Sequence, residues 1–381
     1  MAKVFVPKEC AEGETRVAAT PETVKRLVKL GHSVTVEAHA GDGAHLADSA
    51  FEQAGAAITR APKGAWATAD LVLKVDAPAQ NALLGADEAS LLRDGAVLIG
   101  LLSPYKNLPM VRTLAQRRVT SLAMELVPRI SRAQTIDALS SQANLAGYKA
   151  VLLAATRLAK YFPLFMTAAG TIKPARVVIM GAGVAGLQAL ATARRLGALV
   201  EVSDIRPEVK EQVESLGGKF IELPLESGSG QGGYAKEVTP EFLRKQQEIV
   251  AVRVAAADVV VTTALVPGRP APKLVTEAMV KSMRSGAVIV DLATSQGGNC
   301  ELSKPNQEVV VHGVTILGPT NLPATMAEDA SNLYARNVLA LVLLLSKDGG
   351  AISLDLADEI ITGSLLTHEG QVRHAPTAQA L

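Results

Sequence analysis

One segment, residues 176–204 with the sequence RVVIMGAGVAGLQALATARRLGALVEVSD, limits the possible folds more than any other part of the chain. A run typical of a buried strand ends at Met180, a G-x-G-x-x-G motif follows, and an alanine-rich stretch typical of a helix comes directly after it. A second apolar run then ends in Asp204. This order of strand, glycine turn, helix and strand predicts a βαβ unit, and therefore a parallel sheet covered by helices.

The three glycines of the motif, Gly181, Gly183 and Gly186, predict a binding site for a dinucleotide. Bare backbone N–H groups at the positive end of a helix can hold a pyrophosphate. Asp204 follows the last glycine by eighteen residues, where a carboxylate can accept hydrogen bonds from both ribose hydroxyls. Because this carboxylate would repel a 2′-phosphate, we expect NAD(H) as the ligand and not NADP(H).

Residues that adjoin these positions complete the predicted site. We assign Val184 and Ile205 to it because they flank the glycine turn and the acidic residue. Arg206 lies two residues beyond Asp204 and has three interpretations: a solvated charge, a group that stacks on adenine, or a ligand of a 2′-phosphate. The nearby carboxylate disfavours the last one.

The same alternation of strands and helices continues on both sides of this segment. Short β-rich runs precede it at 3–7, 33–37, 71–75 and 96–102, and others follow it at 218–223, 258–265 and 287–293. We therefore predict an α/β fold with two doubly wound Rossmann-like domains, joined by long helices near 136–161 and 324–345, with a cleft between them. The first domain would combine 1–138 with 328–381, and the NAD(H)-binding domain would span 139–327. Residues 350–381 are expected to form a short appendage.

Composition excludes several classes of protein. The 381 residues carry 38 basic and 37 acidic side chains, so no overall positive field favours nucleic acid. The two cysteines, Cys10 and Cys300, lack the spacing of a metal motif, and we predict free thiols and no metal site. The first ten residues do not resemble a signal peptide, and the apolar run 338–345 is too short to span a membrane, which indicates a soluble, cytoplasmic protein.

The segment 226–239, ESGSGQGGYAKEVT, contains four glycines and predicts a long loop. It is either a flexible connector or a lid that closes over a bound ligand.

Several longer motifs carry a family resemblance. They are VPKECAEGETRVAATPETVKRL (6–27), VLKV (72–75), GAGVAGLQA (181–189), VTTALVPGRPAPKLVT (261–276) and VIVDLATSQGGNCE (288–301). Together they resemble the superfamily of alanine dehydrogenase and of the NAD(H)-binding component of proton-translocating nicotinamide nucleotide transhydrogenase. The segment PRISRAQTIDALSSQANLAGY (128–148), followed by TAAGT and GGYAKE, resembles the transhydrogenase branch.

The transhydrogenase resemblance implies an NAD(H)-binding alpha-1 (domain I) subunit that transfers hydride directly to NADP⁺ on a partner component. Since no proton is exchanged at the reacting carbons, positioning can replace a general base. The resemblance implies that four residues organise the nicotinamide end and catalyse transfer: Arg129, Gln134, Asp137 and Ser140. Among these, Gln134 is implied to reach the other nucleotide on the partner component. Alternatives are an ion pair of Arg129 and Asp137 that only stabilises the start of a helix, and a surface amide at Gln134.

The resemblance also implies nucleotide contacts from Gly233 and Tyr234, in a closing lid, and from Ala264 and Leu265. As partners it implies a second copy of the chain, an NADP(H)-binding component and a membrane-spanning proton-conducting component. Because the chain ends at Leu381 without a membrane helix, we expect a separate subunit that lies on the inner face of the cytoplasmic membrane through its partners.

Two other functions stay open. Arg16 and Lys74 match the substrate-carboxylate residues of alanine dehydrogenase, so the chain could be an amino-acid dehydrogenase. The position of that enzyme's catalytic histidine is Ser103 here, however, which removes the acid–base group. A non-catalytic NAD(H)-sensing module would use the same glycines without transferring hydride.

Overall fold

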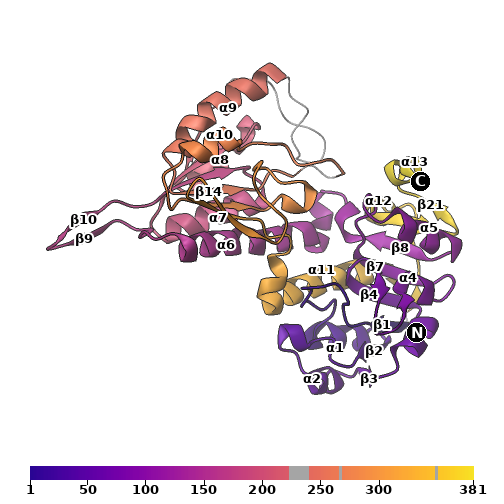
Figure 1. The fold of residues 1–381 in the computed structure, drawn as a ribbon. Coiled ribbons are helices and arrows are strands. Elements are labelled where there is room, and N and C mark those ends of the chain that lie inside the picture. The colour runs from indigo at the N-terminus through magenta and orange to yellow at the C-terminus, as the bar shows by residue number, and fades with distance from the viewer. Residues whose placement is uncertain (223–239, 266–267, 348–350) are drawn as a thin grey trace. The chain divides into compact units, whose positions relative to one another are not determined.

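The computed structural model describes residues 1–222, 240–265, 268–347 and 351–381 (Figure 1). The chain divides into two compact units, unit 1 with Met1–Gln142 and Pro323–Leu381, and unit 2 with Ala143–Leu322. Each unit contains a mainly parallel sheet with helices packed on it. The predicted α/β class with two doubly wound sheets is therefore confirmed.

Unit 1 is built on an eight-stranded sheet. In spatial order its strands are β21 (Gln371–Val372), β20 (Leu365–His368), β8 (Thr120–Ala123), β7 (Val97–Leu101), β4 (Leu71–Asp76), β1 (Lys3–Val6), β2 (Ser33–Glu37) and β3 (Ala57–Thr59). The six strands from β8 to β3 are parallel, and β20 and β21 are antiparallel. The chain order reverses between β1 and β4, so this point is where a doubly wound sheet forms its crevice.

The helices of unit 1 include α1 (Pro21–Lys29), α2 (Asp48–Gln53), α3 (Pro62–Thr68), α4 (Glu88–Leu91), α5 (Leu108–Gln116), α11 (Ala327–Leu345), α12 (Glu359–Ser364) and α13 (Ala375–Ala380). Apolar residues of α11, among them Val338 and Val342, are fully buried against the sheet. The expectation that 350–381 is only an appendage was wrong, because β20 extends the sheet beside β8. Helix α6 (Ala138–Arg157) begins in unit 1 and continues into unit 2.

Unit 2 is built on a seven-stranded sheet. Its spatial order is β13 (Lys219–Phe220), β12 (Leu199–Ser203), β11 (Arg176–Met180), β14 (Val259–Thr262), β15 (Val288–Asp291), β17 (Val314–Leu317) and β16 (Glu308–Val311), and only β16 is antiparallel. Val177 and Ile179 of β11 pack toward α7 (Val184–Arg195), whereas Val178 packs with α9 (Pro240–Ala255). Both faces of the strand are buried, which explains its continuous apolar sequence.

The remaining helices of unit 2 are α8 (Lys210–Ser215) and α10 (Glu277–Ser282). A ribbon of β9 (Phe165–Thr167) and β10 (Gly170–Ile172) lies outside the large sheet and extends away from unit 2 in Figure 1. Two shorter ribbons, β5 (Gln80–Asn81) with β6 (Ala86–Asp87) and β18 (Ser346–Lys347) with β19 (Ala351–Ile352), belong to unit 1.

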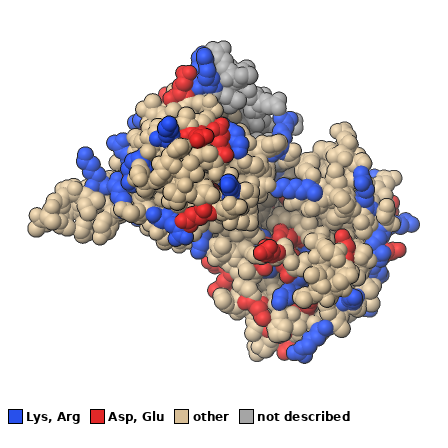
Figure 2. Space-filling model, in the orientation of Figure 1, with Lys and Arg blue, Asp and Glu red and all other residues tan. Residues whose placement is uncertain are grey.

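Charged side chains of both signs occur on each unit in the face that Figure 2 shows. Among the described helices, none combines the length and the apolar character needed to cross a bilayer.

Candidate functional site

The glycine turn after β11 leaves no room for side chains at two of its three glycines. Gly181 has φ +106°, and a Cβ there would lie 2.6 Å from Oγ1 of Thr263. A Cβ on Gly186 would lie 1.8 Å from the carbonyl oxygen of Gly181, so α7 packs directly on the turn. Gly183 differs, because a Cβ there would meet no atom within 4 Å in the part of the chain that the structure describes. The turn therefore offers bare backbone and open space at the amino end of α7, as a pyrophosphate requires.

Helix α6 fixes the start of α7 by another close approach. A Cβ on Gly147 would lie 2.1 Å from the carbonyl oxygen of Ala185. Beside this contact, Nδ2 of Asn144 donates to Oε1 of Gln188 at 3.1 Å. Val184, the first residue of α7, is 37% exposed, so it remains accessible to a ligand.

Asp204 is joined to the glycine turn. Its Oδ2 accepts from the backbone N–H of Ala182 at 2.6 Å. Its Oδ1 accepts from the backbone N–H and Nε of Arg206, at 2.9 and 3.0 Å, and Oδ2 also accepts from Nη2 at 3.0 Å. Arg206 is thus an ion-pair partner of Asp204, and the intervening Ile205 is half-buried. The carboxylate that is proposed for the ribose hydroxyls lies at the end of β12, adjacent to the turn.

The segment after β14 completes this edge of the sheet. Oγ1 of Thr263 donates to the carbonyl oxygen of Gly181 at 3.1 Å. The fully buried Asn299 holds Ala264 on both sides: its Oδ1 accepts from the Ala264 N–H at 3.0 Å, and its Nδ2 donates to the Ala264 carbonyl at 2.9 Å. Leu265 follows and is half-buried.

These residues lie at the carboxyl ends of the paired strands β11 and β14, between which the chain order reverses, at the switch point of the unit 2 sheet. Sequence reasoning missed Thr263 and Asn299. The Thr-Thr pair at the end of a buried strand is a signal for the first, and no local signal marks the second.

The predicted nicotinamide residues lie in unit 1. Asp137 caps α6: its Oδ1 accepts from the backbone N–H of Ser140 at 2.8 Å, and its Oδ2 accepts from Oγ of Ser140 at 2.6 Å. Arg129 and Gln134 are exposed on the preceding segment. Asn337 of α11 fixes this segment, because its Nδ2 donates to the carbonyl of Thr135 at 2.8 Å.

The structure therefore brings together Gly181, Gly186, Asp204 and Ala264 in unit 2, and Asp137 with Ser140 in unit 1. Gly233 and Tyr234, which were assigned to a lid, lie outside the described residues.

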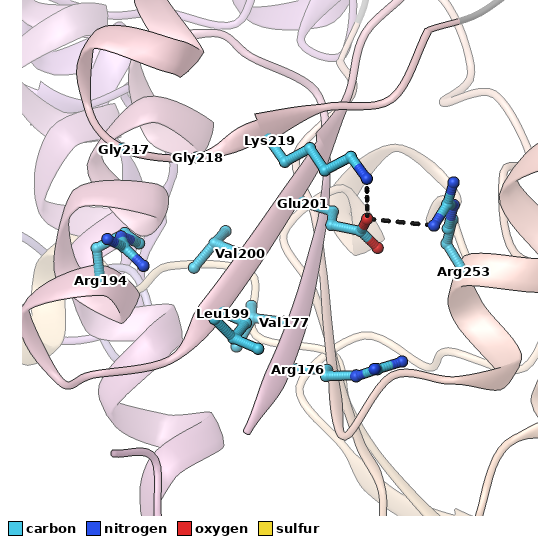
Figure 3. Close-up of a pocket in the computed structure, with 10 residues that line it drawn as sticks. All are labelled: Arg176, Val177, Arg194, Leu199, Val200, Glu201, Gly217, Gly218, Lys219 and Arg253. Carbon is cyan, nitrogen blue, oxygen red and sulfur yellow. Dashed lines mark hydrogen bonds and ion pairs between the residues drawn. The ribbon is translucent and has the colours of Figure 1, made fainter. Parts of the chain in front are cut away.

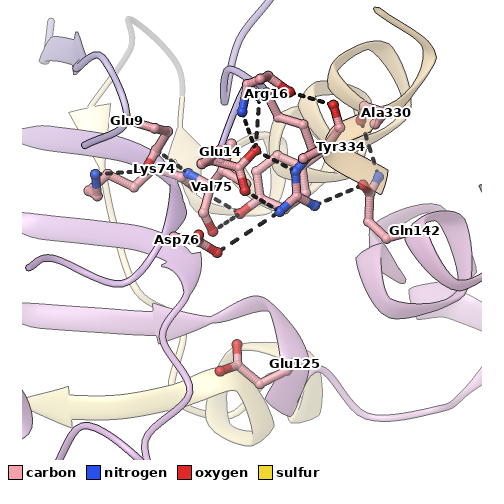
Figure 4. A network of polar contacts seen from close by, with 12 residues as sticks. Glu9, Glu14, Arg16, Lys74, Val75, Asp76, Glu125, Gln142, Ala330 and Tyr334 are labelled. Atoms are coloured by element: carbon pink, nitrogen blue, oxygen red, sulfur yellow. Dashed lines mark hydrogen bonds and ion pairs between the residues drawn. The ribbon is translucent and has the colours of Figure 1, made fainter. Parts of the chain in front are cut away.

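The switch point of the unit 1 sheet is filled by charged side chains (Figure 4). Lys74 of β4 is fully buried, and its Nζ lies 2.8 Å from Oε2 of Glu9 and 3.1 Å from Oε2 of Glu88. The hydroxyl of Tyr334, from α11, donates to the Lys74 carbonyl at 2.8 Å. Lys74 therefore has its partners within the chain itself.

Arg16 is similarly engaged. Its Nε and Nη2 contact the two carboxylate oxygens of Glu14 at 2.8 and 2.6 Å, a bidentate pair that is almost fully buried. Its Nη1 donates to Oε1 of Gln142 at 3.0 Å, and Nη2 lies 3.9 Å from Oδ1 of Asp76. The carboxylates in this cluster outnumber the cations, and burial raises the pKa of Glu9 to about 7 and raises that of Asp76 as well.

At the histidine position of alanine dehydrogenase, Ser103 has φ +45°. Glu125 accepts hydrogen bonds from the backbone N–H groups of Leu102 and Ser103, and burial raises the pKa of this carboxyl. Glu125 thus holds the turn, and the residue at the histidine position carries no imidazole.

The two doubly wound units, and the glycine turn with the adjacent Asp204, define a Rossmann-type protein of the dinucleotide-binding class. Models of the alanine dehydrogenase/PNT family match the chain over most of its length, the N-terminal domain at residues 5–146 and the C-terminal domain at residues 150–375. The chain belongs to this family.

Among its relatives, the first portion of NAD(P) transhydrogenase subunit alpha from Rhodospirillum rubrum is 50% identical over 376 residues, which cover 98% of each chain. A crystal structure of transhydrogenase from Sinorhizobium meliloti is 45% identical, covers 97% of this chain and 99% of its own, and has a TM-score of 0.86. The alanine dehydrogenase of Mycolicibacterium smegmatis is more distant, with 30% identity over 99% of this chain and 96% of its own length.

Substitutions of the glycines should distinguish effects on the stability of the fold from effects on the affinity for NADH. We expect Gly183→Ala to change the free energy of unfolding by less than about 1 kcal/mol, because its methyl group meets no atom of the described residues within 4 Å. It should weaken NADH binding at least about tenfold, since the methyl group occupies space that the phosphates need. Gly186→Ala should instead cost about 1–3 kcal/mol or more of stability through its contact with Gly181.

Chemical denaturation and NADH fluorescence titration measure the two effects. Unchanged NADH affinity in Gly183→Ala would contradict the position assigned to the pyrophosphate.

The buried cluster should make the stability of unit 1 depend on pH. Glu9 has a pKa of about 7 in the fold against an ordinary value of 4.5, so the folded chain binds more protons between these limits. Its contribution to the free energy of unfolding therefore falls as pH rises from about 4.5 to about 7, and is constant above that range. Asp76, whose pKa is also raised, adds to the same slope.

Glu9→Gln should make this slope shallower, and Glu12→Gln, at an exposed position of the same segment, should leave it unchanged. The single tryptophan, Trp66, is fully buried in unit 1, so its fluorescence reports the unfolding of this unit. Equal slopes for the wild type and Glu9→Gln between pH 4.5 and 7 would exclude Glu9 as the titrating group.

Proposed function

We infer that this chain is the NAD(H)-binding subunit of a proton-translocating NAD(P) transhydrogenase. The observation that carries the inference is 50% identity, over 98% of both chains, to the R. rubrum transhydrogenase subunit. The intact glycine turn and Asp204 agree with an NAD(H) site. Hydride passes directly between NADH on this chain and NADP⁺ on a partner component.

In this mechanism the main task of the protein is to position the nucleotide, and acid–base chemistry matters less. Backbone groups of Gly181 and Gly183 receive the pyrophosphate at the amino end of α7, and Asp204 receives the ribose hydroxyls. Asp137 and Ser140 orient the carboxamide of the nicotinamide, with Arg129 and Gln134 beside them on the same segment. Because hydride moves between two C4 carbons without a proton transfer, the chain needs no general base where Ser103 stands.

The family's other activity, amino-acid oxidation, fits less well. Its general base is absent at Ser103, and the alanine dehydrogenase of M. smegmatis shares only 30% identity with the chain. Arg16 and Lys74, the two cations that match its substrate residues, are paired with Glu14, Glu9 and Glu88. A substrate carboxylate would compete with these internal partners.

The partners follow from the same assignment. Relatives named as alpha subunits indicate a complex of several components. We assign NADP(H) to one partner component and proton conduction to another that spans the membrane, with this chain on the cytoplasmic side.

We propose that the β9–β10 ribbon packs against a second copy of the chain. The ribbon carries exposed apolar side chains: Leu164 is 55% exposed, Phe165 45%, Met166 72% and Ile172 39%. Tyr161 stacks on Phe165 with ring centroids 5.4 Å apart. An isolated two-stranded ribbon is marginally stable in water, so these side chains need a surface to cover them. Pairing between two copies would provide it and form a homodimer.

Hydride transfer tests the function directly. NADH oxidation should be fast with an NADP⁺ analogue of distinct absorbance when an NADP(H)-binding transhydrogenase component is present, and absent without it. Asp137→Asn should lower this rate at least about tenfold with less than about a threefold change in NADH affinity, because asparagine retains the helix cap and loses the charge.

Asp87→Asn is the matched control, since Asp87 caps α4 by a similar contact to Ala89. NADH formation from L-alanine and NAD⁺ would instead identify an amino-acid dehydrogenase. If neither assay shows hydride transfer, the non-catalytic NAD(H)-sensing module is favoured. An unchanged rate of hydride transfer in Asp137→Asn would contradict the role assigned to Asp137 in orienting the nicotinamide.

The oligomeric state of the chain tests whether the β9–β10 ribbon is an interface between two copies. Sedimentation of the wild-type chain should give twice the monomer mass, and Met166→Glu should shift the mass toward the monomer because it places a charge on the covered surface. Leu83→Glu, at a side chain 90% exposed in unit 1, should leave the dimer intact. A monomeric wild type, or a Met166→Glu variant that remains dimeric, would contradict the proposal.

A further inference from the structure

A hollow of about 400 Å³ lies in unit 2 at the amino ends of the strands (Figure 3). Arg176 and Leu199, the first residues of β11 and β12, line it together with Gly217 and Gly218. The glycine turn and Asp204 follow the other ends of these same two strands. The hollow is therefore distinct from the dinucleotide site.

The register of the sheet creates this hollow. Leu199 and Val200 pair with β11, but β13 first pairs with β12 at Glu201, so the preceding two residues of β12 have no strand beside them on that side. The turn before β13 stays narrow because it contains two glycines. A Cβ on Gly217, at φ +81°, would lie 3.2 Å from Nε of Arg194, and one on Gly218 would lie 2.7 Å from a methyl group of Leu190.

The lining is strongly cationic. It contains four basic side chains and one acidic side chain: Arg176, Arg194, Lys219, Arg253 and Glu201. Glu201 pairs with two of these cations, since its Oε1 lies 3.3 Å from Nη1 of Arg253 and 3.9 Å from Nζ of Lys219. Within the described residues of the chain, neither Arg176 nor Arg194 has an acidic partner. Nη1 of Arg194 donates to the carbonyl oxygen of Ala198 at 3.4 Å, so its other donors and the guanidinium of Arg176 have capacity for an anion.

We propose that this hollow binds a small anion that carries two or more phosphate groups. A formal charge of +3, from four cations and one carboxylate, favours a multiply charged ligand. Guanidinium groups bind phosphate oxygens in a bidentate manner, and Leu199, which is 49% exposed, offers an apolar contact for a nucleoside attached to the phosphates.

The surroundings place the phosphates on one side of the hollow. A neighbouring hollow of about 330 Å³ shares Glu201, Lys219 and Arg253 but adds the carboxylates of Glu214 and Glu222. Oε1 of Glu222 lies 2.5 Å from Nζ of Lys210, which offsets its charge, so Glu214 is the carboxylate that disfavours an anion on that side. The phosphates therefore lie away from Glu214, and Arg176 and Arg194 line the hollow from opposite sides of β11 and β12 (Figure 3).

Calorimetric titration of the full-length protein, saturated with NADH, tests the site. Pyrophosphate and ATP are the two probes: equal affinity shows that the phosphates alone are recognised, and tighter ATP binding shows that a nucleoside adds contacts. Arg194→Gln and Arg176→Gln should each weaken binding about tenfold. Glu201→Gln should strengthen it several-fold, because it removes the only carboxylate among the lining residues.

Arg195→Gln is the matched control, since Arg195 is the next residue of α7, is exposed like Arg194 and does not line the hollow. NADH fluorescence, followed in the same titration, should stay constant. The proposal is overturned if neither probe binds, if either probe displaces NADH, or if Arg194→Gln and Arg195→Gln bind equally. A loss of binding in Glu201→Gln, with its fold intact by circular dichroism, would also contradict it because the expected change has the opposite sign.

Discussion

Three segments of unit 2 approach one another at the end of β11 with no space for a methyl group between them. Gly181 contacts the segment after β14, Gly186 contacts the carbonyl of Gly181, and Gly147 of α6 contacts the carbonyl of Ala185 in α7. These contacts fix the direction of α7 and bring its amino end to the switch point of the sheet. Gly183 is free of such contacts, so the one glycine without a packing role is the one that faces the space for the ligand. Gly186 therefore serves packing, Gly183 leaves space for the proposed ligand, and Gly181 contributes to both.

The two doubly wound sheets use their switch points differently. In unit 2 the switch point holds backbone N–H groups and open space, whereas in unit 1 it holds a buried cluster around Lys74 and Arg16. Buried charges incur a large desolvation penalty, and good geometry with additional hydrogen bonds is needed to offset it. Tyr334 and Gln142 supply such bonds, to the backbone of β4 and to Arg16. The crevice of unit 1 is therefore filled by the protein's own groups.

The sequence predicted what depends on local pattern. The βαβ unit, the glycine turn and the place of Asp204 beside it follow from residues that are near one another in the chain. Contacts between distant segments could not be read in this way: Asn299 reaches Ala264 across 35 residues, and β20 adds to β8 only after the chain returns from unit 2. The sequence allows three interpretations of Arg206, because only the fold decides that its side chain turns back to Asp204.

The cluster also explains why Arg16 and Lys74 occur in a chain without the general base of an amino-acid dehydrogenase. Without Lys74, Glu9 and Glu88 would be fully buried carboxyls with no cation between them, and without Arg16 the same would hold for Glu14. Loss of one member of a buried ion pair costs about 3–5 kcal/mol, a large part of the stability of a domain. By contrast, the position of Ser103 contributes backbone contacts to Glu125, which do not require a particular side chain. The fold therefore favours both cations independently of the substrate, whereas Glu125 places no demand on the side chain at position 103.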